Sequence, residues 1–194
     1  NDIVMMQELI WKLRPDVIIE TGVAHGGSTI LYASILDLLG HGKVIGIDID
    51  IRKQNLLAIK SHPLSKRIEL IEGSSSANDV VENVRDMLPQ NSKAMVILDS
   101  NHSYKHVLSE MNLYKEFISA GGYMVVMDGI QEMLHNTPSG KDQWVKDNPL
   151  IAIREFLTDN PDWEVDPYYQ RTFITCNPSG FLRRKGKRKN ITTK

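Results

Sequence analysis

The chain has 194 residues, of which 41% are hydrophobic and 24% are charged, and its formal net charge is −1. This length supports one α/β domain with a sizeable core and is too short for two domains of ordinary size. The balanced charge excludes an overall field that attracts nucleic acid or an anionic membrane, and the apolar runs are too short to span a bilayer.

Helical and extended patterns alternate along most of the chain. Apolar residues at helical spacing between Met5 and Leu13 predict a first helix, which ends at Arg14-Pro15. Short apolar runs predict strands over residues 17–20, 43–48, 67–72, 94–99 and 122–128. Further helices are predicted over residues 28–39, 51–60, 78–88, 104–119 and 150–157. This alternation is typical of a parallel sheet covered by helices on both faces.

The last third of the chain is less regular. Residues 129–148 show no clear periodicity and predict a long loop, which in a compact domain is more often functional than idle. Thr172–Thr175 and Phe181–Arg184 flank the sequence CNPSG, and this arrangement predicts an antiparallel hairpin that closes the sheet.

One domain is expected over residues 1–184. Six cations between Arg183 and Lys189 predict a solvated basic tail over residues 185–194. Cys176 is the only cysteine, so no disulfide forms within this chain. That usage fits a reducing compartment, and we expect a cytoplasmic protein that spans no membrane and binds no nucleic acid.

Acidic residues follow or end the predicted strands. They are Glu20, Asp48, Glu72, Asp99 and Asp128. A single such residue would be explained as a helix N-cap. Ligands of an open parallel sheet bind beyond the carboxyl ends of its strands, and clustered carboxylates repel one another unless a cation or hydrogen-bond donors lie among them. The pattern therefore predicts a binding site at this edge of the sheet.

The turn after the first strand, VIIETGVAHGGS, is compatible with two kinds of cofactor. Its spacing, Gly22-x-x-x-Gly26-Gly27, departs from the dinucleotide fingerprint G-x-G-x-x-G. The carboxylate of Glu20 would also face the diphosphate of a dinucleotide, and the two negative charges would repel each other. S-adenosylmethionine fits better: Glu20 can accept from its amino group, the glycines permit close approach of the backbone, and Asp48 can accept from both ribose hydroxyls.

Four stretches, LIWKLRPDVIIETGVAHGGST, IGIDID, LDSNHSYKHV and TFITCNPSGFLRR, together resemble the cephalosporin hydroxylase family over residues 7–184. That family has the class I S-adenosylmethionine-dependent methyltransferase fold. The resemblance implies an α/β, Rossmann-like domain with a mainly parallel seven-stranded sheet, helices on both faces and an antiparallel C-terminal hairpin. It also implies a methyl donor bound by Glu20, Gly22, Gly27, Ser28 and Asp48, with Gly73 and Ser74 beside the adenosine.

The resemblance further implies a divalent metal, usually magnesium, held by Asp99 and Asp128. The family commonly carries two acids at the end of the fifth strand, whereas this chain has Met127-Asp128. A metal that binds neighbouring sugar hydroxyls would lower the pKa of one of them. Asp99 or His102 would then accept the proton, although His102 could also be a metal ligand, a helix cap or an exposed side chain.

Other candidate residues have weaker signals. His106 is expected to pack within its helix. Gln131, Glu132 and His135 fall in the long loop and are candidates for a lid or a wall of the acceptor site. Trp144, in the same loop, is the tryptophan best placed to stack on a sugar ring.

The function predicted from these features is S-adenosylmethionine-dependent O-methylation of a sugar in a glycan, glycolipid or glycosylated natural product. The partner would be a small-molecule or glycan acceptor, and the family implies a homo-oligomer. Three alternatives stay open. They are a catalytically degenerate S-adenosylmethionine-binding protein, a nucleotide-dependent oxidoreductase and a metal-independent N-methyltransferase.

Overall fold

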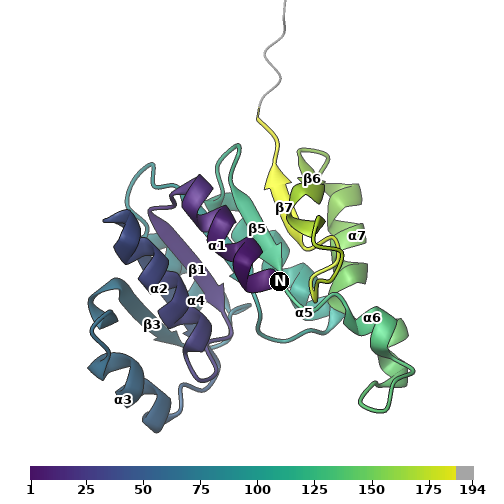
Figure 1. Cartoon of the computed structure of the whole chain (residues 1–194), viewed down its shortest axis with the longest axis horizontal. Helices are drawn as coiled ribbons and strands as arrows, with labels where there is room; N and C mark the ends of the chain where they lie inside the picture. Colours follow the sequence, from purple (N-terminus) through teal and green to yellow (C-terminus); the bar gives the residue numbers. More distant parts are fainter. Residues whose placement is uncertain (187–194) are drawn as a thin grey trace, which may run out of the picture.

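A computed structural model describes residues 1–186 of the chain as seven strands with helices packed around them (Figure 1). The strands are β1 (Val17–Thr21), β2 (Lys43–Asp48), β3 (Ile68–Glu72), β4 (Ala94–Leu98), β5 (Tyr123–Val126), β6 (Trp163–Val165) and β7 (Phe181–Arg184). They form one sheet in the order β3-β2-β1-β4-β5-β7-β6. Neighbouring strands from β3 to β5 are parallel, and β7 runs antiparallel to both β5 and β6.

Within residues 1–186, seven α-helices precede, connect or follow these strands. They are α1 (Asp2–Leu13), α2 (Gly27–Leu39), α3 (Lys53–Ser61), α4 (Asn78–Met87), α5 (Tyr104–Tyr114), α6 (Gln131–Leu134) and α7 (Pro149–Asp159). No helix within residues 1–186 is long and apolar enough to cross a membrane.

Successive strand residues point to opposite faces of the sheet, and this separates the core into two apolar layers. Ile18 packs in the layer with buried residues of α1 and α2, such as Leu9 and Leu36. Ile19, the next residue, packs in the layer with buried residues of α4, α5 and α7. Helices therefore cover both faces, as predicted (Figure 1). The prediction of a mainly parallel seven-stranded sheet is confirmed.

The predicted strand at Thr172–Thr175 is wrong, because β6 is formed by Trp163–Val165 instead. Trp163 is buried and makes an edge-to-face contact with Phe156, with ring centroids 5.5 Å apart. Phe173 is 95% exposed and has a φ of 61°, a left-handed conformation that does not continue a strand. Burial of Trp163 therefore selects the strand that pairs with β7.

Two other boundaries differ from the prediction. The helix expected over residues 104–119 ends at Tyr114 and continues only as a 3₁₀ turn, Lys115–Phe117. The loop over residues 129–148 contains the single helical turn α6 and a 3₁₀ turn, Asp142–Val145. The predicted basic tail falls mostly on residues 187–194, which lie outside the described part of the chain.

Candidate active site

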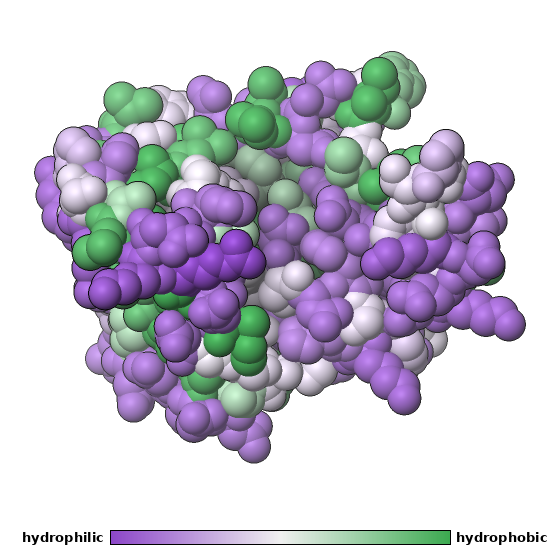
Figure 2. Space-filling view, turned by 90° about the horizontal axis from the view of Figure 1, so that it is seen from below, coloured by the Kyte–Doolittle hydropathy of each residue, from purple (hydrophilic) through white to green (hydrophobic). Residues whose placement is uncertain are grey.

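A cavity of about 420 Å³ opens at the carboxyl ends of the parallel strands. It is lined by Gly22 and Ala24 after β1, and by residues 47–49, 73–75 and 99–101, which end or follow β2, β3 and β4. Here β1 and β4 are neighbours although their connections lead to opposite sides of the sheet, which is the usual ligand position in such folds. Figure 2 views this side of the molecule, where hydrophilic residues surround a central hollow.

Gly22 brings the turn after β1 close to the end of β4. A Cβ atom at this position would lie 2.1 Å from the backbone oxygen of Asp99, and the φ of Gly22 is 91°. The Gly22 N–H donates to the Ile47 carbonyl at 2.8 Å, and the Asp99 N–H donates to the Thr21 carbonyl at 2.9 Å. Only glycine satisfies both the close approach and the left-handed backbone.

Asp48 holds the glycine turn in place and also lines the cavity. Its Oδ2 accepts from the N–H groups of Val23 and Ala24 at 2.9 and 2.8 Å, and its Oδ1 accepts from the Asp50 N–H at 3.1 Å. These hydrogen bonds orient the Asp48 carboxylate, which is the group predicted to contact the ribose hydroxyls. Gly73 and Ser74, the other residues predicted beside the nucleoside, line the same cavity.

Glu20 does not line this cavity, because it is fully buried within β1. The Thr29 hydroxyl donates to Oε2 at 2.5 Å, and Oε1 has no hydrogen-bond partner among the described residues. Burial raises the pKa of Glu20 to about 7, although hydrogen bonds from Ser28 and Thr29 oppose the shift. Gly27 and Ser28 begin α2 outside the cavity lining, and a Cβ added to Gly27 would meet no atom within 4 Å.

Replacing Glu20 with glutamine is expected to stabilise the ligand-free protein at pH 8. The folded-state pKa lies above the ordinary value of 4.5, so stability is fully present below that pH and is lost as pH rises through about 7. The variant avoids this loss, and its unfolding free energy should exceed that of the wild type by on the order of 2 kcal/mol at pH 8. Urea unfolding at pH 5 and pH 8 measures the difference, and equal stability at pH 8 would contradict the assignment of a buried charge.

A second group of side chains lies where β4 and β5 end. One ligand atom each from Asp99, His102 and Asp128 lie within 4.8 Å of one another. His102 Nε2 is 3.5 Å from Asp128 Oδ2 and 3.9 Å from Asp99 Oδ1. Burial, together with the charges of Asp128 and Glu110, raises the pKa of Asp99 to about 7. The structure thus brings together the three residues predicted for the metal and the base.

Met127 packs against the apolar layer that includes α1 and α2. The side chain at this position is therefore part of the core, and His102 supplies the third member of the polar group.

Asn177 fixes the backbone of Asp128 and was missed in the sequence. Asp128 has a φ of 58°, and its N–H donates to Asn177 Oδ1 at 2.8 Å. Asn177 is itself buried. Its only signal was its position within CNPSG, which the sequence analysis treated as a hairpin turn.

His106 lies in the cavity wall, although the sequence predicted a packing role for it. Its Nε2 lies 3.1 Å from Ser75 Oγ, 3.3 Å from Ser100 Oγ and 3.4 Å from Glu110 Oε1. The hydrogen bond with Glu110 raises the pKa of His106.

His102 lines a smaller cavity of about 210 Å³. Its wall includes Asn101, which also lines the larger cavity, together with Gln131 and Trp144 from the long loop. Two other loop candidates are engaged elsewhere. Glu132 pairs with Arg154 at 3.0 Å, and His135 Nδ1 lies 2.9 Å from the Glu132 carbonyl.

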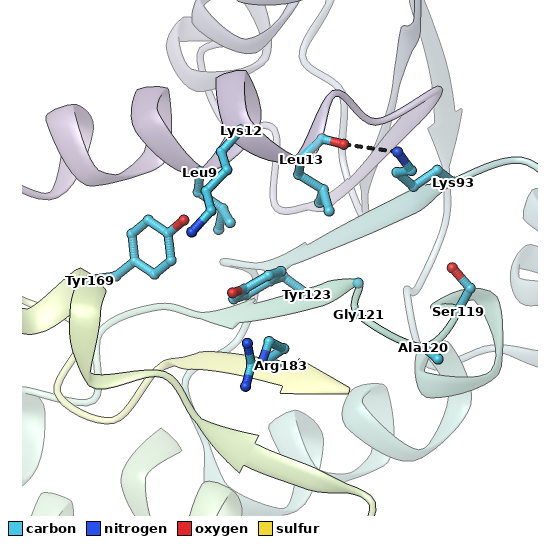
Figure 3. Close-up of a pocket in the computed structure, with 11 residues that line it drawn as sticks. Leu9, Lys12, Leu13, Lys93, Ser119, Ala120, Gly121, Tyr123, Tyr169 and Arg183 are labelled. Carbon is cyan, nitrogen blue, oxygen red and sulfur yellow. Dashed lines mark hydrogen bonds between the residues drawn. The ribbon is translucent and has the colours of Figure 1, made fainter. Parts of the chain in front are cut away.

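Another cavity, of about 350 Å³, opens at the opposite edge of the sheet. Figure 3 shows Leu13 and Lys93, which precede β1 and β4, beside Tyr123 at the start of β5. None of the predicted site residues lines it. The candidate active site is therefore at the carboxyl edge.

The family described as rhamnosyl O-methyltransferase/CmcI matches residues 1–185. The chain belongs to this family. A rhamnosyl O-methyltransferase of Mycobacterium leprae is 31% identical over 192 residues, covering 95% of this chain and 78% of the relative. A rhamnosyl O-methyltransferase of Mycobacterium tuberculosis is 32% identical over 191 residues, covering 95% and 73%.

Solved structures share the fold of this rhamnosyl O-methyltransferase/CmcI member. Ligand-free CmcI has a TM-score of 0.65 at 23% identity and covers 95% of this chain and 70% of its own. MycE, in complex with Mg, S-adenosylhomocysteine and mycinamycin VI, has a TM-score of 0.62 at 18% identity and covers 97% and 50%. The class I methyltransferase fold implied by the sequence is confirmed.

Proposed function

We propose that the chain is an S-adenosylmethionine-dependent O-methyltransferase that acts on a sugar hydroxyl of a rhamnosylated or similarly glycosylated acceptor. The observation that carries this proposal is the grouping of Asp99, His102 and Asp128, in which Asp99 lines the larger cavity and His102 lines the smaller one, while Asn101 lines both cavities. The larger cavity suits the donor and the smaller one suits a sugar. The names of the mycobacterial relatives support the acceptor class.

The larger cavity offers the donor an ordered set of polar groups. Asp48 is positioned to accept from the ribose hydroxyls, and Gly73 and Ser74 lie along the same wall. Gly22 lets the turn after β1 pack against the Asp99 backbone, and the methyl group would reach the acceptor beside this contact. Gly27 and Ser28, at the start of α2, complete the proposed donor site, because no atom lies within 4 Å of a Cβ added at Gly27 and a ligand can approach closely there. Glu20 is buried in β1 and would act on this end of the donor site through its hydrogen bond with Thr29 of α2.

The side-chain atoms of Asp99, His102 and Asp128 that could bind a metal fit a divalent cation. Asp99 and Asp128 provide carboxylate oxygens, which Mg²⁺ prefers, and His102 provides an imidazole nitrogen within the same small volume. The like charge of Asp128 contributes to the raised pKa of Asp99, and a cation would remove that repulsion. A bound Mg²⁺ ion would increase the acidity of a sugar hydroxyl at the site.

The chain's own residues position the acceptor and remove its proton. Trp144 and Gln131 wall the smaller cavity, where an indole face can stack on a sugar ring. His102 lines that cavity, and if Asp99 and Asp128 alone held the cation, its Nε2 would be free to accept the hydroxyl proton. Asp99 is the alternative base, since a carboxylate oxygen that does not hold the cation can accept the proton. In-line attack on the methyl group then depends on how both cavities orient their ligands.

Transfer of an isotope-labelled methyl group tests the proposal. The protein is incubated with labelled S-adenosylmethionine, Mg²⁺ and an aryl rhamnoside, and the product is located by mass spectrometry. We expect EDTA-sensitive labelling of a sugar hydroxyl. A parallel reaction supplies an amine acceptor in place of the rhamnoside. Labelling of that amine to the same extent with and without EDTA would instead identify the metal-independent N-methyltransferase.

Replacing Asn177 with alanine is expected to weaken metal binding about tenfold, since groups that orient metal ligands typically contribute 10- to 100-fold. The substitution removes the acceptor of the Asp128 N–H, which supports the left-handed conformation of Asp128. Asn177→Asp keeps an acceptor oxygen and adds a negative charge, so it should bind the metal at least as tightly as the wild type does. Calorimetric titration with Mn²⁺ compares the three proteins, and equal affinities would show that Asn177 does not orient Asp128.

A further inference from the structure

The cavity at the amino edge of the sheet has a charge pattern that the proposed methyl transfer does not use. Three basic residues, Lys12, Lys93 and Arg183, line it, and no carboxylate within residues 1–186 does so. They come from α1, from the residue before β4 and from β7. The volume of about 350 Å³ is large enough for a small organic molecule. A lining with charges of one sign favours an anionic ligand.

Two of these cations have no carboxylate partner in the described part of the chain. Lys12 Nζ lies 5.4 Å from the centroid of the Tyr168 ring. Lys93 Nζ donates to a backbone carbonyl of α1 at 3.2 Å, which leaves two of its three donors. Arg183 differs, because its guanidinium pairs with Glu164 at 2.5 Å. Lys12 and Lys93 therefore supply the positive charge that a ligand in this cavity would meet.

A buried hydroxyl group without a partner belongs to the same cavity wall. Tyr169 is 0% exposed, and its hydroxyl has no hydrogen-bond partner within residues 1–186. Figure 3 shows this hydroxyl pointing toward α1. The Tyr169 ring stacks on Phe181 with centroids 5.3 Å apart and meets Tyr123 edge-on at 5.8 Å. Packing of the ring therefore fixes the hydroxyl, although leaving a buried polar group unpaired costs free energy.

The Tyr169 hydroxyl can donate a hydrogen bond to an anion. Burial, together with the charge of Asp166, raises the pKa of Tyr169 to about 12, so the hydroxyl keeps its proton at neutral pH. Asp166 itself accepts from the Tyr123 hydroxyl at 2.7 Å and from the Tyr168 N–H at 3.0 Å. It does not line the cavity. The free donor at Tyr169 thus matches the sign of the two lysines.

The rest of the lining determines the class of anion. Leu9, Leu13 and the ring of Tyr123 offer an apolar wall, and the turn over residues 119–122 adds only short side chains. A phosphate monoester combines a dianionic group, which suits two ammonium groups and a hydroxyl on separate elements, with an organic group for the apolar wall. A carboxylate would bring only one negative charge to the same donors.

We propose that this cavity binds a small phosphate monoester, with the phosphate held by Lys12, Lys93 and the Tyr169 hydroxyl. The organic group lies against the apolar wall. The site shares no lining residue with the cavities at the carboxyl edge, so it is a second site that is independent of the proposed methyl transfer.

Calorimetric titration of the full chain with phenyl phosphate tests this site. EDTA is present throughout, so that no metal ion at the carboxyl edge captures the phosphate, and a parallel titration contains saturating S-adenosylhomocysteine. We expect phenyl phosphate to bind with the same affinity in both titrations. Inorganic phosphate, which lacks the ring, and benzoate, which lacks the second charge, should each bind at least about tenfold more weakly.

Two variants assign the binding to named side chains. Tyr169→Phe removes only the hydroxyl and should weaken phenyl phosphate binding at least about tenfold. Its stability to urea should equal or exceed that of the wild type, because a buried unpaired group is lost. Lys12→Met removes one exposed charge and should also weaken binding about tenfold. Lys105→Met, exposed on α5 and outside this cavity, is the matched control and should bind as the wild type does.

Several results would overturn the proposed site. They are no binding of phenyl phosphate by the wild type, equal affinity for inorganic phosphate, or binding that S-adenosylhomocysteine abolishes, which would place the phosphate at the carboxyl edge. Wild-type affinity in Tyr169→Phe and Lys12→Met would overturn it as well. A loss of stability in Tyr169→Phe would show that the hydroxyl serves the fold and would refute its assignment as a ligand contact.

Discussion

Replacing Asp99 with asparagine is expected to lower the rate of methyl transfer by about a thousandfold. The amide keeps the shape of the side chain but loses the charge that binds a cation and the basicity that accepts a proton. The backbone hydrogen bond from Asp99 to Thr21 does not involve the side chain, so the fold should be retained. Calorimetry should therefore show loss of Mn²⁺ binding, while S-adenosylhomocysteine still binds in the presence of EDTA.

Asp142→Asn provides the matched control for this experiment. Asp142 is exposed in a 3₁₀ turn of the long loop and lies outside the group formed by Asp99, His102 and Asp128. It should transfer methyl groups and bind Mn²⁺ as the wild type does. Wild-type turnover by Asp99→Asn would refute the proposed role of Asp99 as ligand and base. A wild type that binds the donor but methylates no acceptor would support the catalytically degenerate alternative.

Two glycine substitutions between β1 and the start of α2 should affect different properties. Gly22→Ala should reduce stability, and Gly27→Ala should reduce ligand affinity. Gly22→Ala places a Cβ atom 2.1 Å from a backbone oxygen of Asp99 at a left-handed φ. We expect its unfolding free energy to fall by about 3 kcal/mol or more. Gly27→Ala meets no atom within 4 Å and should change stability by less than about 0.5 kcal/mol. If Gly27 borders the donor, however, its affinity for S-adenosylhomocysteine should fall about tenfold.

Urea unfolding and calorimetry distinguish these expectations. Each variant is also the control for the other, because both substitutions add one methyl group, at positions five residues apart between β1 and the start of α2. A stable Gly22→Ala protein would contradict the close approach of the turn to β4. Unchanged donor affinity in Gly27→Ala would show that the donor does not approach α2 at this residue.

Much of the fold could be predicted because its signals are local. Short apolar runs identified the parallel strands, helical spacing identified most helices, and the acids at the strand ends identified the edge that carries the cavity. The same logic predicted that the acids at the strand ends lie near one another. In the structure, Leu98 and Val126 are paired in neighbouring strands, and this pairing brings Asp99 and Asp128 together. These features follow from residues close to one another in sequence.

Features that depend on distant contacts could not be predicted. The three residues of β6 are too few to show a period, and the burial of Trp163 against Phe156 decides where that strand lies. The contact from Asp128 to Asn177 joins residues 49 positions apart. The helical phase that turns His106 toward the cavity is set by the packing of α5 on the sheet, which its own sequence does not specify.

Titration of the wild-type protein with S-adenosylhomocysteine, with Mg²⁺ and with EDTA, tests the central claim most directly. The account predicts binding in both buffers, weakened at least tenfold in Asp48→Ala, because the cavity beside Gly22 and Asp48 is the donor site. Absence of binding in both buffers, or equal affinity in Asp48→Ala, would contradict that assignment.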